Sequence, residues 1–100
     1  MNEFRINHSP SSMNHPDYVF GKVGKKYKSL GLTHTPKPEF RSKDLLKNPN
    51  PKDSDVSYIQ TKVKTTSQKY FSKPMNNWSF HPDDRAYVRH IVKKYRKKRK

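Results

Sequence analysis

Repulsion among positive charges is the strongest constraint on what this chain can fold into. Its 100 residues include 23 Lys and Arg but only 8 Asp and Glu, which gives a formal net charge of +15. A charge excess of this size destabilises a compact state, and only 29% of the residues are hydrophobic. Low hydrophobicity with high net charge is also the composition of disordered chains. We expect one small domain with a thin core built largely from aromatic residues, because each of these can bury roughly 150–250 Å².

The same charge predicts a polyanionic partner. Nucleic acid is the leading candidate, with RNA ahead of DNA, and an acidic protein such as an antitoxin or immunity protein is another. An anionic membrane surface is a distant second candidate, ahead of an acidic protein. No apolar run approaches the roughly 20 residues needed to cross a bilayer, and residues 1–4 lack signal-peptide features. We therefore expect a cytoplasmic protein without a membrane partner. The chain has no Cys, which excludes disulfides, thiolate metal sites and a cysteine nucleophile.

Strand patterns dominate the first two thirds of the chain. Residues 18–34 are rich in strand formers and have Gly24 where a tight turn needs a positive φ, so we expect a β-hairpin. Gly31 within the second strand predicts a bulge or the close approach of another backbone. Residues 1–17 are expected to be irregular, apart from an alternation that would suit a short edge strand near Phe4.

A long Pro- and Asn-rich connection, residues 35–55, follows the hairpin, and connections of this length are often functional. Within it, Leu45 and Leu46 are expected to hold one helical turn against the core. Alternation over residues 56–66 predicts a third strand, and residues 68–78 are expected to form a loop. Four side chains of this loop are expected to fill the core: Tyr70, Phe71, Met75 and Trp78.

The last segment has the pattern of an amphipathic helix. Ser79 is expected to cap it, Pro82 suits its first turn, and Asp83 and Asp84 suit the positive end of the helix dipole. One apolar stripe has helical spacing and consists of Tyr87, Val88, Ile91, Val92 and Tyr95. The opposite side is expected to carry Arg85, Arg89, Lys93 and Arg96.

These patterns predict an α+β fold in which a small, mostly antiparallel sheet of about three to four strands packs on the C-terminal helix, with long irregular loops. The expected organisation is an irregular segment at residues 1–17, a single domain at residues 18–95 and a basic tail at residues 96–100.

Cations interleaved with Tyr are expected to contact phosphates, because Lys and Arg dominate affinity for nucleic acids and exposed aromatics stack on unpaired bases. The residues expected to bind nucleic acid are Lys22, Lys25, Lys26, Lys28, Lys62, Lys64, Arg85, Arg89 and Lys93. The alternative is that the lysines only solubilise the chain and that tyrosines such as Tyr87 and Tyr95 belong to the core.

Three residues are candidates for catalysis. His34 ends the second predicted strand beside the long connection, and a His near its ordinary pKa suits proton transfer at neutral pH. His15 is a second candidate, and Tyr58 would position a scissile phosphate. The five histidines lack the spacing of a metal site, and no carboxylate cluster suggests Mg²⁺, so neither a metal nor a cofactor is expected. Cleavage of RNA would then use its own 2′-hydroxyl as nucleophile.

Residues 15–34, HPDYVFGKVGKKYKSLGLTH, resemble small basic domains of phage and mobile-element origin that are associated with the barnase/RelE-like nuclease superfamily. Residues 47–52, 57–59 and 78–80 are similar to the same pattern, so the resemblance spans most of the chain. It implies a small α+β domain whose sheet binds and cleaves RNA without metal, as a toxin-like endoribonuclease does. The alternatives are a non-enzymatic nucleic-acid-binding module, such as a phage regulatory protein, and an inhibitor that occupies an acidic protein surface.

Overall fold

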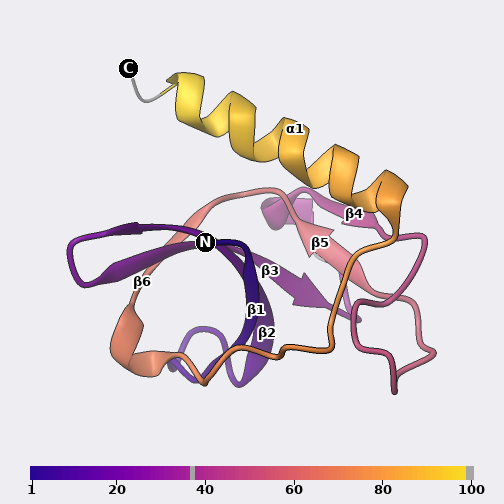
Figure 1. The fold of residues 1–100 in the computed structure, drawn as a ribbon, viewed down its shortest axis with the longest axis horizontal. Coiled ribbons are helices and arrows are strands. Elements are labelled where there is room, and N and C mark those ends of the chain that lie inside the picture. The colour runs from indigo at the N-terminus through magenta and orange to yellow at the C-terminus, as the bar shows by residue number, and fades with distance from the viewer. Residues whose placement is uncertain (37, 99–100) are drawn as a thin grey trace.

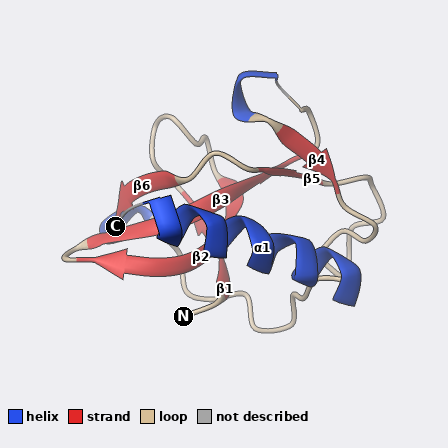
Figure 2. Cartoon of the chain, turned by 90° about the horizontal axis from the view of Figure 1, so that it is seen from above, coloured by secondary structure: helices blue, strands red, loops and turns tan. Residues whose placement is uncertain are grey.

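The computed structural model describes residues 1–36 and 38–98, and it confirms the expected α+β fold. An antiparallel six-stranded sheet packs on one C-terminal α-helix, which lies across one face of the sheet (Figures 1 and 2). The six strands are two more than the largest number expected. They are β1 (Glu3–Asn7), β2 (His15–Val23), β3 (Lys26–Thr33), β4 (Ser42–Asp44), β5 (Tyr58–Gln60) and β6 (Lys64–Ser67). Two short 3₁₀ turns, η1 (Pro38–Phe40) and η2 (Gln68–Tyr70), precede the helix α1 (Pro82–Lys98). No helix in the described ranges is both long and apolar enough to cross a membrane.

The predicted hairpin is confirmed as β2 and β3, which pair antiparallel along most of their length. Gly24 lies in the turn with φ +59°, the left-handed conformation that favours glycine. The bulge lies in β2, between Val19 and Gly21, and not at Gly31. A Cβ at Gly31 would clash with the Gln60 side chain and lie 3.0 Å from Nζ of Lys64. The expected close approach at Gly31 is therefore made by side chains of the neighbouring strands, not by a backbone.

The single strand expected at residues 56–66 is wrong, because the chain forms β5 and β6 there. Both pair with the same edge of β3. The register moves three positions along β3, from Leu32 to Ser29, but five positions along the partner, from Ile59 to Lys64. Two residues between Ile59 and Lys64 therefore have no pairing position on β3, and this interruption divides the predicted strand into β5 and β6.

The long connection contains a strand where a helical turn was expected. β4 pairs with β5, and the N–H of Leu45 continues that pairing by donating to the Ser57 carbonyl at 2.9 Å. An extended backbone places successive side chains on opposite sides. Leu45 is accordingly buried in the core, whereas Leu46 is 68% exposed. The prediction that both leucines anchor one helical turn is therefore wrong.

The N-terminal segment is more regular than expected. β1 pairs with β2, which begins at His15, so only part of residues 1–17 is irregular. The sheet thus extends beyond the expected boundary at residue 18. The alternation that suggested a short edge strand near Phe4 is confirmed.

The outer edge of β1 is covered by a segment distant in sequence. The N–H of Met75 donates to the carbonyl of Phe4 at 2.7 Å, and the N–H of Ser72 donates to the carbonyl of Ile6 at 3.0 Å. The Ser72 hydroxyl also accepts the Ile6 N–H at 2.9 Å. Backbone groups that would otherwise face solvent along this strand are therefore satisfied within the chain.

Helix α1 begins three residues after the expected cap. The backbone N–H of Asp83 donates to Nδ1 of His81 at 3.1 Å, so His81 satisfies one of the free N–H groups of the first turn. Ser79 is not the cap, because its own N–H donates to the Pro49 carbonyl at 3.2 Å and ties this segment to the long connection. Pro82 occupies the first helical position, as expected.

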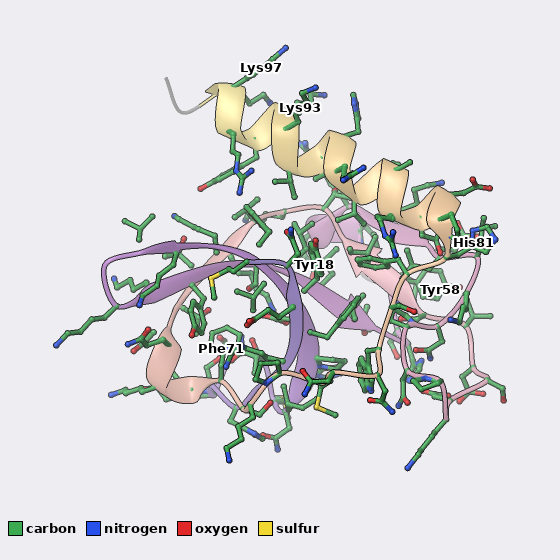
Figure 3. The ribbon with its side chains drawn as sticks, viewed as in Figure 1. Tyr18, Tyr58, Phe71, His81, Lys93 and Lys97 are labelled. Atoms are coloured by element: carbon green, nitrogen blue, oxygen red, sulfur yellow. The ribbon has the colours of Figure 1, made fainter. Side chains whose placement is uncertain are left out.

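The apolar stripe of α1 is confirmed, with Val88 and Val92 buried against the sheet. Half-buried side chains extend it on either side: Tyr87, Ile91 and Tyr95. Lys93 and Lys97 lie on the side of the helix that faces away from the sheet (Figure 3).

Arg96 does not belong to the outer side of α1, where the sequence pattern placed it. Its Nη2 donates to the Phe20 carbonyl at 3.1 Å, and its guanidinium lies 5.9 Å from the Phe20 ring. Arg96 follows Val92 by four residues, so it lies on the same face of the helix. The helix also includes residues 96–98 of the expected tail, and Arg99 and Lys100 lie outside the described residues.

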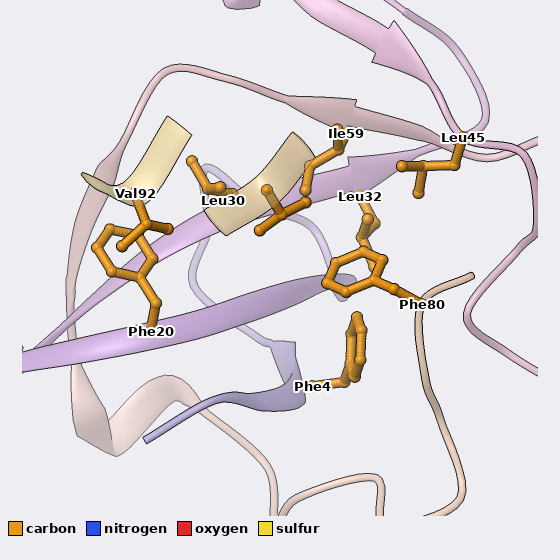
Figure 4. Close-up of a cluster of buried hydrophobic side chains, with 9 residues drawn as sticks. Phe4, Phe20, Leu30, Leu32, Leu45, Ile59, Phe80 and Val92 are labelled. Atoms are coloured by element: carbon orange, nitrogen blue, oxygen red, sulfur yellow. The ribbon is translucent and has the colours of Figure 1, made fainter. Parts of the chain in front are cut away.

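The core lies between the sheet and α1 (Figure 4), and three of its nine buried members are aromatic, so it is less aromatic than expected. Its buried members come from strands, connections and helix: Phe4, Phe20, Leu30, Leu32, Leu45, Ile59, Phe80, Val88 and Val92. Phe80 makes edge-on contacts with Phe4 at 4.8 Å and with Tyr18 at 5.0 Å between ring centroids.

Of the loop side chains expected to fill the core, Met75 and Trp78 pack against it. Phe71 instead packs edge-on against Tyr27, with 5.1 Å between ring centroids. Tyr70 is not part of the cluster, and the Lys69 ammonium lies over its ring at 5.2 Å. The prediction for Tyr70 is therefore wrong.

Candidate nucleic-acid interface

Exposed cations lie on several elements, and two groups of them include predicted binding residues. The first lies on the outer face of α1 and consists of Arg85, Arg89, Lys93, Lys94 and Lys97. The second lies at the tip of the β2–β3 hairpin and consists of Lys22, Lys25 and Lys26. Lys62, between β5 and β6, is also exposed.

Two of the predicted binding lysines are engaged inside the fold. The Lys28 ammonium donates to the Thr65 hydroxyl at 2.6 Å and lies 6.0 Å from the Tyr95 ring, so it joins the sheet to α1. The Lys64 ammonium lies 2.9 Å from the carboxylate of Asp17, which is fully buried.

The carboxylate of Asp17 has two further donors, the Asn7 amide at 2.9 Å and the Ser29 hydroxyl at 2.8 Å. A buried carboxylate needs such partners because removing it from water is costly. The role of Lys64 in this structure is to neutralise Asp17.

The cations of α1 and of the hairpin tip have no carboxylate partners within the described residues. Ion pairs there join Arg5 to Glu3, His34 to Asp53 and Lys64 to Asp17, and all of these lie outside the two exposed groups. The positive field of the helix also reaches the sheet. Burial raises the pKa of the Tyr18 hydroxyl, and nearby arginines of α1 oppose this effect.

A cavity of about 210 Å³ lies at the open end of the β2–β3 hairpin. It is lined by His15, Pro16, Leu32, Thr33, His34, Asn48, Asn50, Asp53, Ser57 and Trp78. The pairing register explains why two histidines meet here. Asp17 pairs with Gly31. His15 lies two positions before Asp17, at the start of β2, and is therefore level with Thr33, the residue before His34. Two of the three predicted catalytic residues therefore line one cavity.

Both ring nitrogens of His34 face hydrogen-bond acceptors. Nδ1 lies 3.0 Å from the Val56 carbonyl oxygen, and Nε2 lies 3.1 Å from a carboxylate oxygen of Asp53. The hydrogen bond to Val56 raises the pKa of His34, with a smaller contribution from the charge of Asp53. The hydrogen bond from the Asp55 N–H lowers the pKa of Asp53, and His34 adds to this effect. The doubly protonated imidazolium therefore fits this position, and it fastens the long connection to the end of β3.

His15 keeps one ring nitrogen available. Its Nδ1 lies 2.7 Å from the Ser12 carbonyl oxygen, which can only accept, so Nδ1 carries the proton in the neutral ring. Nε2 makes no hydrogen bond to any described residue, and it can therefore accept a proton. Tyr58 pairs with Thr33 across β3 and β5 but does not line the cavity.

Part of the cavity lining comes from a loop of consecutive side-chain turns. The N–H groups of Asn50, Lys52 and Asp55 donate, at 3.0 Å each, to the side-chain oxygen of the residue two positions earlier. Asn and Asp favour such turns because their side chains replace a backbone acceptor.

This loop is also held from the helix. The buried carboxylate of Asp84 accepts the N–H of Leu46 at 2.9 Å and that of Lys47 at 3.3 Å. Asp84 lies at the positive end of the helix, as expected, and it also binds the distant backbone at Leu46 and Lys47, which the sequence did not indicate.

Among the described residues, His34, Asp53 and Asp55 form a group that could hold a metal ion, because their potential ligand atoms lie within 4.8 Å of one another. The ion pair of His34 with Asp53 and the turn from Asp53 to Asp55 account for this arrangement without a metal.

Eight of the ten residues that line the cavity were not predicted as site residues, and Trp78, Asn48 and Asn50 are among them. Trp78 was assigned to the core, and the Asn residues of the long connection were expected only to form a loop. A single Trp beside a helix start and a repeated Asn-Pro pair were the available signals.

No protein-family model matches this chain, and searches of curated proteins and of solved structures find no match.

Proposed function

We propose that this protein binds nucleic acid, with RNA as the preferred partner, through the exposed cations of α1 and of the hairpin tip. The observation that carries this proposal is that these cations have no carboxylate partners among the described residues. Unpaired Lys and Arg gain most from contact with phosphates, because binding releases the counterions condensed on the nucleic acid.

Salt dependence tests the proposal. If about six phosphates are contacted, the logarithm of the association constant should fall against the logarithm of salt concentration with a slope of roughly −4 to −5. Fluorescence anisotropy of a labelled single-stranded RNA at several salt concentrations gives this slope. Binding that is weak and independent of salt would contradict the proposal.

A pair of matched variants locates the interface. The double substitution R89Q/K93Q removes two exposed cations from α1 and should reduce the magnitude of the salt slope by about 1.4, because each contact with a single strand contributes about 0.7. The control K69Q/K73Q removes the same charge from exposed positions near η2 and should leave the slope unchanged. Equal effects of the two variants would show that only net charge matters. An acidic protein as the true partner would appear as tight binding to that protein with no measurable affinity for RNA.

A second candidate function is metal-independent cleavage of RNA, which the resemblance to barnase/RelE-like nucleases implies. The observation that favours it is the shared cavity of His15 and His34. Nε2 of His15 would take the proton from a ribose 2′-hydroxyl as its oxygen bonds to phosphorus. The bond from phosphorus to the 5′-oxygen would break, and the His34 imidazolium would protonate that oxygen after leaving Asp53. The products are a 2′,3′-cyclic phosphate and a 5′-hydroxyl.

Incubation of the purified protein with total RNA in EDTA tests this activity. H15A and H34A should each reduce cleavage by roughly 10²–10⁴-fold. H8A is the control, because His8 is exposed and does not line the cavity. Absence of cleavage by the parent protein would leave a binding module without catalysis.

A further inference from the structure

Trp78 lines the cavity, and its ring also contacts the core. Its ring lies 6.0 Å from that of Phe4 at an interplanar angle of 47°, and its backbone N–H donates to the Met75 carbonyl at 3.2 Å. The side chain is only half-buried although it packs against the core. A fixed aromatic ring with remaining exposed area is the arrangement on which unpaired bases stack.

While His34 stays paired with Asp53, the interior of this cavity suits a neutral ring better than a phosphate. None of the lining residues is Lys or Arg, and the carboxylate of Asp53 is among them. Asp53 is paired with His34, so the wall presents no unbalanced positive charge to an anion. Pro16 and Leu32 add apolar surface.

Two polar groups at the cavity have hydrogen-bonding capacity left. Nε2 of His15 can accept a hydrogen bond. The Asn50 amide nitrogen can donate one, because the amide oxygen already accepts the Lys52 N–H and the nitrogen has no partner among the described residues. One donor and one acceptor near an aromatic wall match the edge of a nucleobase.

The size of the cavity limits its occupant. About 210 Å³ is below the roughly 300–1,000 Å³ of pockets that enclose drug-sized ligands, so a single planar ring system fits and a complete dinucleotide does not.

The phosphates of such a ligand would meet cations outside the cavity. Ser79, next to Trp78, is bonded to Pro49, and Asp84 is bonded to the backbone at Leu46, so the cavity wall adjoins the start of α1. Exposed Lys47 and Lys52 in the loop and Arg85 in the first turns of α1 flank this junction.

We infer that this cavity receives one unpaired nucleobase, stacked on Trp78, while the adjoining phosphates contact the cations outside it. The inference rests on the proposed nucleic-acid binding and specifies its ligand as single-stranded. It requires no cleavage.

Trp78 is the only Trp of the chain, so its fluorescence reports on this cavity alone. Titration with a short single-stranded RNA should quench the emission with the same dissociation constant that anisotropy gives. An oligonucleotide of equal length with abasic sites should bind more weakly and without quenching. A DNA of the same sequence should also quench, whereas an RNA duplex should bind without quenching.

Substitutions then separate stacking from stability. W78L should weaken binding of the base-containing RNA about 5–150-fold and leave binding of the abasic strand unchanged. Because Trp78 touches the core, N50A serves as a second variant at a residue outside the core, and it should weaken only the base-containing strand.

Three outcomes would overturn the inference. If RNA binds without quenching and the abasic strand binds equally well, the cavity is empty in the complex, although nucleic-acid binding by α1 still holds. Equal quenching by polyglutamate would mean that Trp78 senses charge neutralisation and not stacking. If no oligonucleotide binds at all, both the inference and the proposed function are wrong.

Discussion

The variant K64M isolates the cost of a buried carboxylate that has lost its cation. Asp17 is fully buried and lies 2.9 Å from the Lys64 ammonium, whose side chain is 25% exposed. After the substitution, the carboxylate keeps only the neutral donors of Asn7 and Ser29. Removing one partner of a buried ion pair costs about 3–5 kcal/mol. We expect about 3 kcal/mol, the lower end of this range, because water already reaches Lys64.

Chemical denaturation of the parent and of K64M measures this free energy directly. In thermal unfolding of a domain of this size, 1 kcal/mol corresponds to roughly 4–8 °C in Tm, so the Tm of K64M should be at least about 12 °C below that of the parent. The double variant D17N/K64M removes the charge together with its partner and should recover part of the loss. A K64M protein within about 0.5 kcal/mol of the parent, which is the ordinary range for surface substitutions, would refute the reasoning. A double variant as unstable as K64M would refute the role of the buried charge.

Three further predictions concern other contacts. The raised pKa of His34 adds stability that is complete below about pH 6.5 and is lost as the pH rises through the folded pKa. The lowered pKa of Asp53 adds stability that is complete above about pH 3.8 and is lost as the pH falls through the folded pKa. The stability difference between the parent and H34A, measured by denaturation across pH, should therefore be largest between these limits; a difference independent of pH would contradict the ion pair. D84N should cost about 1–3 kcal/mol in the same assay, because a buried acceptor of backbone N–H groups loses its charge, and an unchanged protein would show that the loop does not depend on it. Deletion of residues 97–100 should lower the affinity for RNA while leaving Tm nearly unchanged, because the apolar stripe ends at Tyr95; a large fall in Tm would show that the end of α1 supports the fold.

The elements that could be predicted from the sequence are those with local causes. The stripe of α1 repeats with the helical period, and the hairpin has Gly24 at its turn, so neighbouring residues determine both. The division of β5 from β6 depends instead on the register against β3, which no local pattern contains. Likewise, β4 exists because β5 is available as its partner.

Arg96 and Ser79 show a second limit of local reasoning. A charged residue was assigned to the outer face of α1, although its long side chain can reach a carbonyl of the sheet from the edge of the apolar stripe. The expected hydroxyl cap was displaced because the Ser79 backbone bonds to the distant Pro49.

The candidate site could be predicted only in part. His15 and His34 were both selected, but as separate candidates. Counting residues outward from the turn at Gly24 would have placed His15 opposite His34 on the neighbouring strand. The bulge in β2 shifts this register by one residue, so that His15 lies opposite Thr33. The contacts of His34 with Asp53 and Val56 could not be foreseen, because they depend on how the long connection folds back.

The covered edge of β1 has a consequence for how this chain behaves at high concentration. A free strand edge is a template on which another molecule can add a strand, which is a common first step toward amyloid. Here the N–H groups of Ser72 and Met75 already occupy carbonyls along that edge. At the other end of the sheet, β4 is only three residues long and carries exposed Lys43 and Asp44, which discourage pairing between molecules. Addition of another strand at the β1 edge should therefore require local release of residues 71–75.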